Sequence, residues 1–157
     1  MRRSSRLFLF PDINVWVALS YDRHVHHIAA LQWFEALAPT SRLFFCRLTQ
    51  LGLLRLLTAP AVMGPDQAKS QQDAWKAYDR WLEDQRVEFL EEPGGLEVAF
   101  RGLTRSAQAS PKDWADSYLV AFAEAARLTV ITFDRAFQGK TKDLVLLKAQ
   151  KQGFSGT

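Results

Sequence analysis

Three aspartates stand at positions where an uncompensated carboxylate would be costly. Asp12 and Asp134 each follow a short apolar run, and Asp116 lies in an apolar segment with Leu119 and Val120 three and four residues further on. A buried charge is unfavourable, and carboxylates that are brought together repel one another unless a hard cation compensates them. The pattern predicts that the three aspartates form a metal site.

Further polar side chains near these aspartates are candidates to assist the same chemistry. Asn14 lies two residues after Asp12, and Thr132 lies two residues before Asp134, where its hydroxyl could orient a metal-bound water. Each of these residues also has a purely structural interpretation. Aspartate and asparagine are common helix caps and turn residues, and threonine is typical of strands.

The elements that must position these side chains alternate along the chain. We expect strands at residues 7–10, 43–46, 87–90, 129–132 and 144–147. We expect helices at 14–20, 26–37, 49–57, 67–82, 96–104 and from 111 to about 127, and a loop at 59–65. Short apolar strands that alternate with helices predict parallel βαβ units, which bind ligands beyond the carboxyl ends of their strands.

The start of the late helix has a strong sequence signal. Ser110 is the expected cap, Pro111 takes the first position, and Asp113 lies three residues after the serine. We therefore interpret Asp113 as part of a capping pair rather than as a fourth metal ligand.

Bulk properties favour one globular domain spanning 1–157, with a basic arm at 1–6 and a polar tail at 148–157. The net charge of +3 and the pI of about 9.2 are compatible with a polyanionic partner. The single cysteine, Cys46, excludes an internal disulfide and favours a reducing compartment, so we expect the cytoplasm. The apolar stretch at the N-terminus is too short for a signal peptide, and we expect no membrane span.

Four segments in order resemble the motifs of PIN-domain nucleases, and most closely those of VapC-type ribonuclease toxins. The segments are residues 10–16, 49–55, 114–119 and 132–137. The resemblance implies a three-layer α/β/α sandwich with a mostly parallel central sheet. It also implies cleavage of RNA with Mg²⁺ or Mn²⁺, a homodimer, and inhibition by a VapB-type antitoxin.

The resemblance also assigns roles to individual residues. The metal-binding acids fall on Asp12, Asp116 and Asp134, and Asn14 and Thr132 fall on supporting polar positions. The family often has a glutamate in its second motif, where this chain has Gln50 on the alignment we prefer. A neutral amide in place of a carboxylate would make the site less negative and would therefore weaken the binding of a second metal ion.

The aromatic helix at 67–82 has more large apolar side chains than one stripe normally buries. Part of the set Trp75, Tyr78, Trp81 and Leu82 is expected to pack on the core. The rest is expected to form, with the leucines of residues 49–57, a dimer interface or an antitoxin groove.

Two other classes of function remain open at the level of the sequence. Receiver and dehalogenase-like proteins also place an aspartate after their first strand and form an aspartyl phosphate, but the sequence around Asp12 lacks their accompanying acids. A catalytically inactive module that binds RNA or an antitoxin is the other alternative, and Gln50 is its only support.

Overall fold

The computed structural model describes residues 7–149, so the basic arm at 1–6 and most of the polar tail lie outside the described residues. The strands are β1 (Phe8–Pro11), β2 (Arg42–Phe45), β3 (Val87–Phe89), β4 (Thr129–Thr132) and β5 (Leu144–Leu146). The helices are α1 (Ile13–Ser20), α2 (His27–Glu35), α3 (Arg47–Leu57), α4 (Pro60–Met63), α5 (Gln71–Glu83), α6 (Leu96–Leu103) and α7 (Asp113–Ala126), with the short 3-10 helix η1 (Arg135–Phe137).

All five strands are parallel and lie in the order β3-β2-β1-β4-β5, which confirms the expected α/β class. The central strand is β1, and it pairs with β4 so that Leu9 lies opposite Thr129. The Asp12 N–H continues this pairing past the end of β1 by donating to the Ile131 carbonyl at 2.8 Å. The carboxyl ends of β1 and β4 therefore lie side by side.

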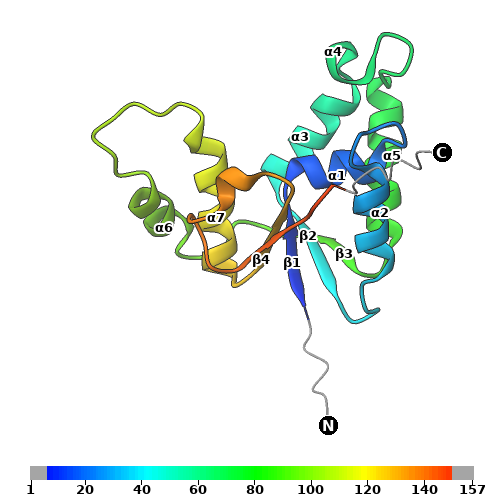
Figure 1. Cartoon of the computed structure of the whole chain (residues 1–157). Coiled ribbons are helices and arrows are strands. Elements are labelled where there is room, and N and C mark those ends of the chain that lie inside the picture. The colour runs from blue at the N-terminus through cyan, green and yellow to red at the C-terminus, as the bar shows by residue number, and fades with distance from the viewer. Residues whose placement is uncertain (1–6, 150–157) are drawn as a thin grey trace, which may run out of the picture.

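Helices cover both faces of the sheet, as Figure 1 shows, and the molecule is a three-layer sandwich. Neighbouring residues of a strand point to opposite faces, so Leu9 belongs to the core under α1, α2, α3 and α5, whereas Phe10 belongs to the core under α6 and α7. Burial on both faces explains why β1 reads as a continuous apolar run.

The helices α1 and α3 approach each other closely at Gly52. A Cβ atom at this position would lie 2.5 Å from Cδ1 of Ile13, so only glycine allows the observed contact. Because Ile13 directly follows Asp12, this contact fixes the helix that begins at the end of β1.

The aromatic helix α5 differs from the expectation in its start. It begins after Ser70, whose hydroxyl accepts the Asp73 N–H at 3.1 Å and so caps the helix four residues later than expected. Tyr78 is buried, and the Trp81 indole N–H donates to the Ser20 hydroxyl at 2.8 Å inside the same chain. Tyr78 and Trp81 are therefore the members of this aromatic set that pack on the core, as part of the set was expected to do.

Two short helical elements were not expected. The predicted loop at 59–65 contains α4, because Pro60 takes the first helical position, where its fixed φ favours a helix and its missing N–H costs nothing. The turn after β4 contains η1, which Asp134 caps. No helix within residues 7–149 is both long enough and apolar enough to cross a membrane.

Candidate active site

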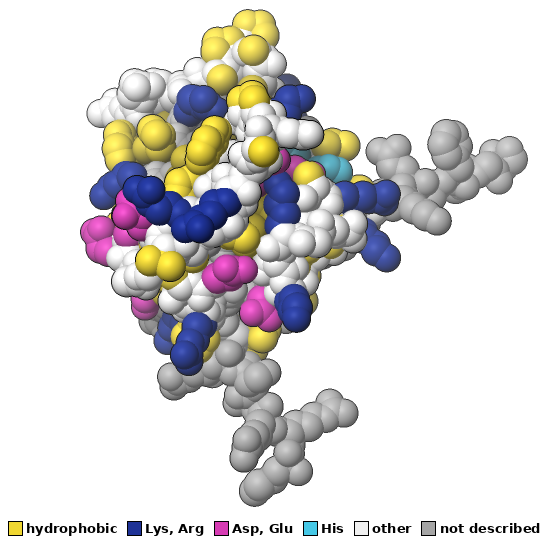
Figure 2. All heavy atoms as spheres, turned by 90° about the vertical axis from the view of Figure 1, so that its left-hand side faces the viewer, with side chains coloured by type: hydrophobic (Ala, Val, Ile, Leu, Met, Phe, Trp, Pro, Cys, Tyr) yellow, Lys and Arg dark blue, Asp and Glu magenta, His cyan; other side chains and the backbone are white. Residues whose placement is uncertain are grey.

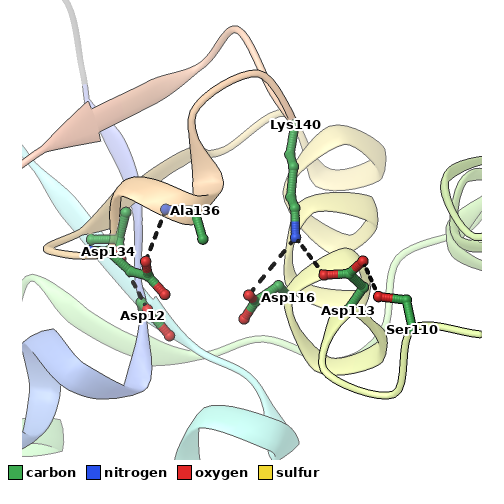
Figure 3. A network of polar contacts seen from close by, with 8 residues as sticks. Asp12, Ser110, Asp113, Asp116, Asp134, Ala136 and Lys140 are labelled. Atoms are coloured by element: carbon green, nitrogen blue, oxygen red, sulfur yellow. Dashed lines mark hydrogen bonds and ion pairs between the residues drawn. The ribbon is translucent and has the colours of Figure 1, made fainter.

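The three predicted aspartates gather at the carboxyl edge of the sheet. Asp12 follows β1, Asp134 follows β4, and Asp116 lies in the first turn of α7. Figure 3 shows Asp116 facing Asp12 and Asp134 across a common space, with Lys140 reaching in from the chain after η1. The charges of Asp116 and Asp134 both raise the pKa of Asp12, so the three carboxylates interact electrostatically.

Asp12 is the most buried of the three, with 7% of its surface exposed. Its Oδ1 accepts the Ile13 N–H at 2.7 Å, and its Oδ2 accepts the Thr132 hydroxyl at 3.0 Å. Burial raises the pKa of Asp12 to about 6, because these two hydrogen bonds compensate only part of the lost hydration. Asp12 is also the N-cap of α1, so its interpretation as a helix cap and its interpretation as a metal ligand are compatible.

Thr132 connects the acids at the ends of the two strands. Its hydroxyl donates to Asp12 and accepts the Asp134 N–H at 3.0 Å. Asp134 in turn accepts the Ala136 N–H at 2.8 Å through Oδ1 and thereby caps η1. The threonine is fully buried, so this bridge is shielded from water.

Asp116 is held by a side chain from a distant part of the sequence. The Lys140 ammonium lies 3.9 Å from Oδ2 of Asp116 and 3.2 Å from Oδ1 of Asp113. Partial burial raises the pKa of Asp116, and the Lys140 charge opposes that effect. Sequence reasoning missed Lys140, since no local pattern links a lysine in a polar loop to a helix that begins 27 residues earlier.

The expected capping pair at the start of α7 is wrong. Lys112 is the N-cap residue, and it makes no side-chain capping bond. The Ser110 hydroxyl donates to the Asp113 carboxylate, while the Asp113 N–H bonds to the Ser110 carbonyl. Asp113 is half exposed and adjoins the site through Lys140.

Gln50 and Asn14 lie differently from the three acids. Gln50 is buried, accepts a hydrogen bond from Arg47 at 2.6 Å and hydrogen-bonds to the core residue Tyr78. Gly52 lies on the side of α3 that contacts Ile13. Residue 50 is about 200° around the helix from Gly52, so Gln50 lies on nearly the opposite side of α3. The Asn14 side chain is exposed on α1.

The donor set is that of a hard divalent cation. Within residues 7–149 no three aspartate, glutamate, histidine or cysteine side chains are close enough to hold one ion together. Mg²⁺ needs only one or two direct carboxylates and keeps several waters, so this spacing is compatible with it. Burial is the main cause of the raised pKa of Asp12, so compensation of its negative charge is favourable, and the Lys140 ammonium already supplies one positive charge beside Asp116.

Comparison with models of known protein families identifies the family of this chain. The model of the PIN domain matches residues 9–142, which is most of the sequence. The chain belongs to the PIN-domain family. The similarity to receiver and dehalogenase-like proteins is therefore limited to an aspartate after the first strand.

Relatives of this PIN domain include two proteins of Mycobacterium tuberculosis. Ribonuclease VapC41 is 39% identical over 132 residues, covering 82% of this chain and 90% of the relative. Ribonuclease VapC38 is 31% identical over 129 residues, covering 78% and 82%.

Solved structures show the same fold at low sequence identity. VapBC2 from Rickettsia felis, bound to a DNA fragment from its promoter, has a TM-score of 0.64 at 13% identity over 89% of this chain and 98% of the other. VapC20 of Mycobacterium tuberculosis, a toxin that cleaves the Sarcin-Ricin loop, has a TM-score of 0.60 at 17% identity over 83% and 92%.

Proposed function

We propose that this chain is the RNA-cleaving toxin of a toxin–antitoxin pair and that it cleaves phosphodiester bonds with Mg²⁺ or Mn²⁺. The observation that carries the proposal is the meeting of Asp12, Asp116 and Asp134 at one edge of a PIN-domain sheet. The names of the ribonuclease relatives support the substrate class.

Each acid has a distinct part in this proposal. One or two of Asp12, Asp116 and Asp134 would bind the cation directly, and the remaining acid would act through the waters of the ion. Thr132 would keep Asp12 and Asp134 oriented through its bridging hydroxyl. A bound divalent cation would neutralise charge on the phosphate oxygens and lower the pKa of a coordinated water. Nothing in this arrangement requires a histidine pair as general acid and base.

The proposed antitoxin contact is an apolar groove next to the acids. Leu51 and Trp75 are exposed on its walls, and Ile13 and Ala115 also line it. These two residues directly neighbour Asp12 and Asp116, so a segment seated in the groove would also restrict access to the site. A partner helix with apolar anchors suits such a surface.

The proposed homodimer has a separate test. Trp75 and Leu82 remain exposed on α5 after Tyr78 and Trp81 are buried within one chain. Light scattering of the purified toxin should give twice the mass of the chain. A mass equal to one chain at micromolar concentration would remove the dimer from the proposal.

Cleavage of a panel of structured RNAs tests the activity. Cleavage should require Mg²⁺ or Mn²⁺, stop on addition of EDTA, and fall on the order of 10³-fold or more in Asp12→Asn. Asp143→Asn, an exposed acid outside the site, is the matched control and should keep full activity. A folded protein that cleaves no RNA in the panel but still binds the antitoxin would favour the inactive binding module.

A further inference from the structure

A second cavity adjoins the aspartate site on the side away from the antitoxin groove. It encloses about 660 Å³ between α6, α7 and the loop that joins them. Asp113, Trp114, Ser117 and Val120 line it with the spacing of one helix face, so α7 forms its floor. The joining loop projects from the fold in Figure 1, and Ser106, Gln108 and Ser110 supply its polar wall.

This cavity adjoins the proposed catalytic site. Asp113 and Lys140 line it, and the same lysine pairs with Asp116. A nucleic acid strand that places a phosphate at the three aspartates therefore has its neighbouring nucleotide beside the cavity. A single nucleotide fits well within a volume of this size.

The chemistry of the lining matches a nucleobase. Trp114 is 56% exposed, and Phe100 steadies its indole from one side with ring centroids 5.9 Å apart. An exposed indole is a stacking platform, whereas the amide of Gln108 and the nearby hydroxyls donate and accept hydrogen bonds, as recognition of a base edge requires.

The charge around the opening favours a strand of phosphates. Arg105 and Lys112 are exposed on the joining loop, and Lys140 lies at the inner edge. Figure 2 shows this face of the molecule, where Lys and Arg side chains and some acidic side chains lie around the apolar areas. Cationic side chains near a stacking platform are the usual arrangement for single-stranded nucleic acid.

We propose that this cavity binds one unstacked nucleobase of the RNA substrate, next to the phosphate that is cleaved, with Trp114 as its stacking partner. The inference rests on the proposed function for the identity of the ligand and extends it to recognition of a nucleotide. It places a specificity-determining site on α7 and the joining loop.

Fluorescence of 2-aminopurine tests the cavity without cleavage. The probes are four single-stranded RNA tetranucleotides, each with 2-aminopurine at a different position, mixed with the full chain in EDTA at low salt. At least one probe should show saturable quenching. Trp114→Ala should weaken its binding roughly 5- to 150-fold and remove most of the quenching, because stacking on one aromatic side chain contributes about 1–3 kcal/mol per base. Trp114→Phe should restore part of both.

The matched control is Phe8→Ala, which removes an exposed aromatic side chain from the amino end of β1, at the opposite edge of the sheet from the three aspartates. It should leave binding and quenching unchanged, and circular dichroism should show that all variants are folded. The absence of saturable quenching with every probe would overturn the inference, and so would equal effects of the two alanine variants.

The same variants separate this inference from the proposed function. Metal-dependent cleavage by the wild type without any quenching would overturn the proposed nucleobase site but leave the proposed function standing. Quenching that depends on Trp114 in a chain that cleaves no RNA would support the nucleobase site and overturn the catalytic proposal.

Discussion

Asp12 and Asp134 are held by backbone N–H groups and by the Thr132 hydroxyl, whereas Asp116 is held by a lysine side chain. In the sheet half of the site, Thr132 joins the two acids, and the N–H groups of Ile13 and Ala136 complete their hydrogen bonds. In the helix half, Asp113 and Asp116 share Lys140, whose side chain is 28% exposed.

The difference shows which part of the site can adapt. Hydrogen bonds from backbone N–H groups and from a buried hydroxyl leave these two side chains little freedom, so the sheet half is organised before any ligand arrives. A solvent-exposed ion pair contributes little stability and is readily exchanged for another cation. The helix half can therefore release Asp116 when a divalent ion or a phosphate enters.

The largest effect on stability is expected from neutralising Asp12 in the sheet half. The pKa of Asp12 is about 6 in the folded protein, whereas an ordinary aspartate has a pKa of 3.8. Between these two pH values the folded state keeps the proton on Asp12 and the unfolded state loses it. Metal-free stability should therefore fall as the pH rises from about 4 to above 6, by about 3 kcal/mol. Asp12→Asn should lack most of this decrease.

Urea unfolding in EDTA between pH 4.5 and 8 measures that difference. Asp143→Asn serves as the reference variant, because this exposed acid lies outside the site. If the free energies of unfolding of the wild type and of Asp12→Asn change with pH in parallel, the buried charge of Asp12 is compensated by something other than the bonds from Ile13 and Thr132.

A smaller loss is expected from breaking the bridge between the two acids of the sheet half. Thr132→Val keeps the shape but leaves Asp12 Oδ2 and the Asp134 N–H without their partner. Unfolding free energy should fall by about 1–3 kcal/mol, and the rate of cleavage should fall as well. Thr132→Ser retains the hydroxyl and should recover most of the rate, and failure of serine to do so would mean that packing, not the bridge, is what matters.

A weaker and salt-dependent effect is expected in the helix half. Lys140→Met removes the cation between Asp113 and Asp116, so the metal-free protein should melt at a slightly lower temperature, with the difference disappearing at 1 M NaCl. Calorimetry should show tighter Mg²⁺ binding, because the ion no longer competes with the ammonium. Lys140→Arg, which keeps the positive charge, is the control. Unchanged Mg²⁺ affinity in Lys140→Met would mean that the Lys140 ammonium and the ion do not compete for the same position.

The smallest effect is expected for Gln50→Glu. The original amide already bonds to Arg47 and Tyr78, so a carboxylate there should pair with Arg47 rather than join the three aspartates. The metal concentration for half-maximal cleavage should change by no more than about twofold. A larger shift toward lower metal concentration would place residue 50 beside the cation, as the resemblance of the second motif implies.

The predictions from sequence were most reliable for features that depend on neighbouring residues. The strands β1 and β4 were expected within one residue of their observed bounds, since short apolar runs bounded by polar residues have few alternatives in an α/β fold. Local signals also misled. Ser110 and Asp113 match a capping pair, yet their side chains bond to each other, and Asp113 also pairs with Lys140.

By itself the sequence determined the parallel α/β fold and the placement of Asp12 and Asp134 at strand ends, because apolar periodicity and chain order fix which residues follow a buried strand. Only the tertiary structure decided that Lys140 meets Asp116, that Gln50 turns toward Tyr78, and that a cavity opens beside Trp114. These contacts join segments far apart in the chain, and their geometry depends on how helices pack on the sheet, which no local pattern encodes.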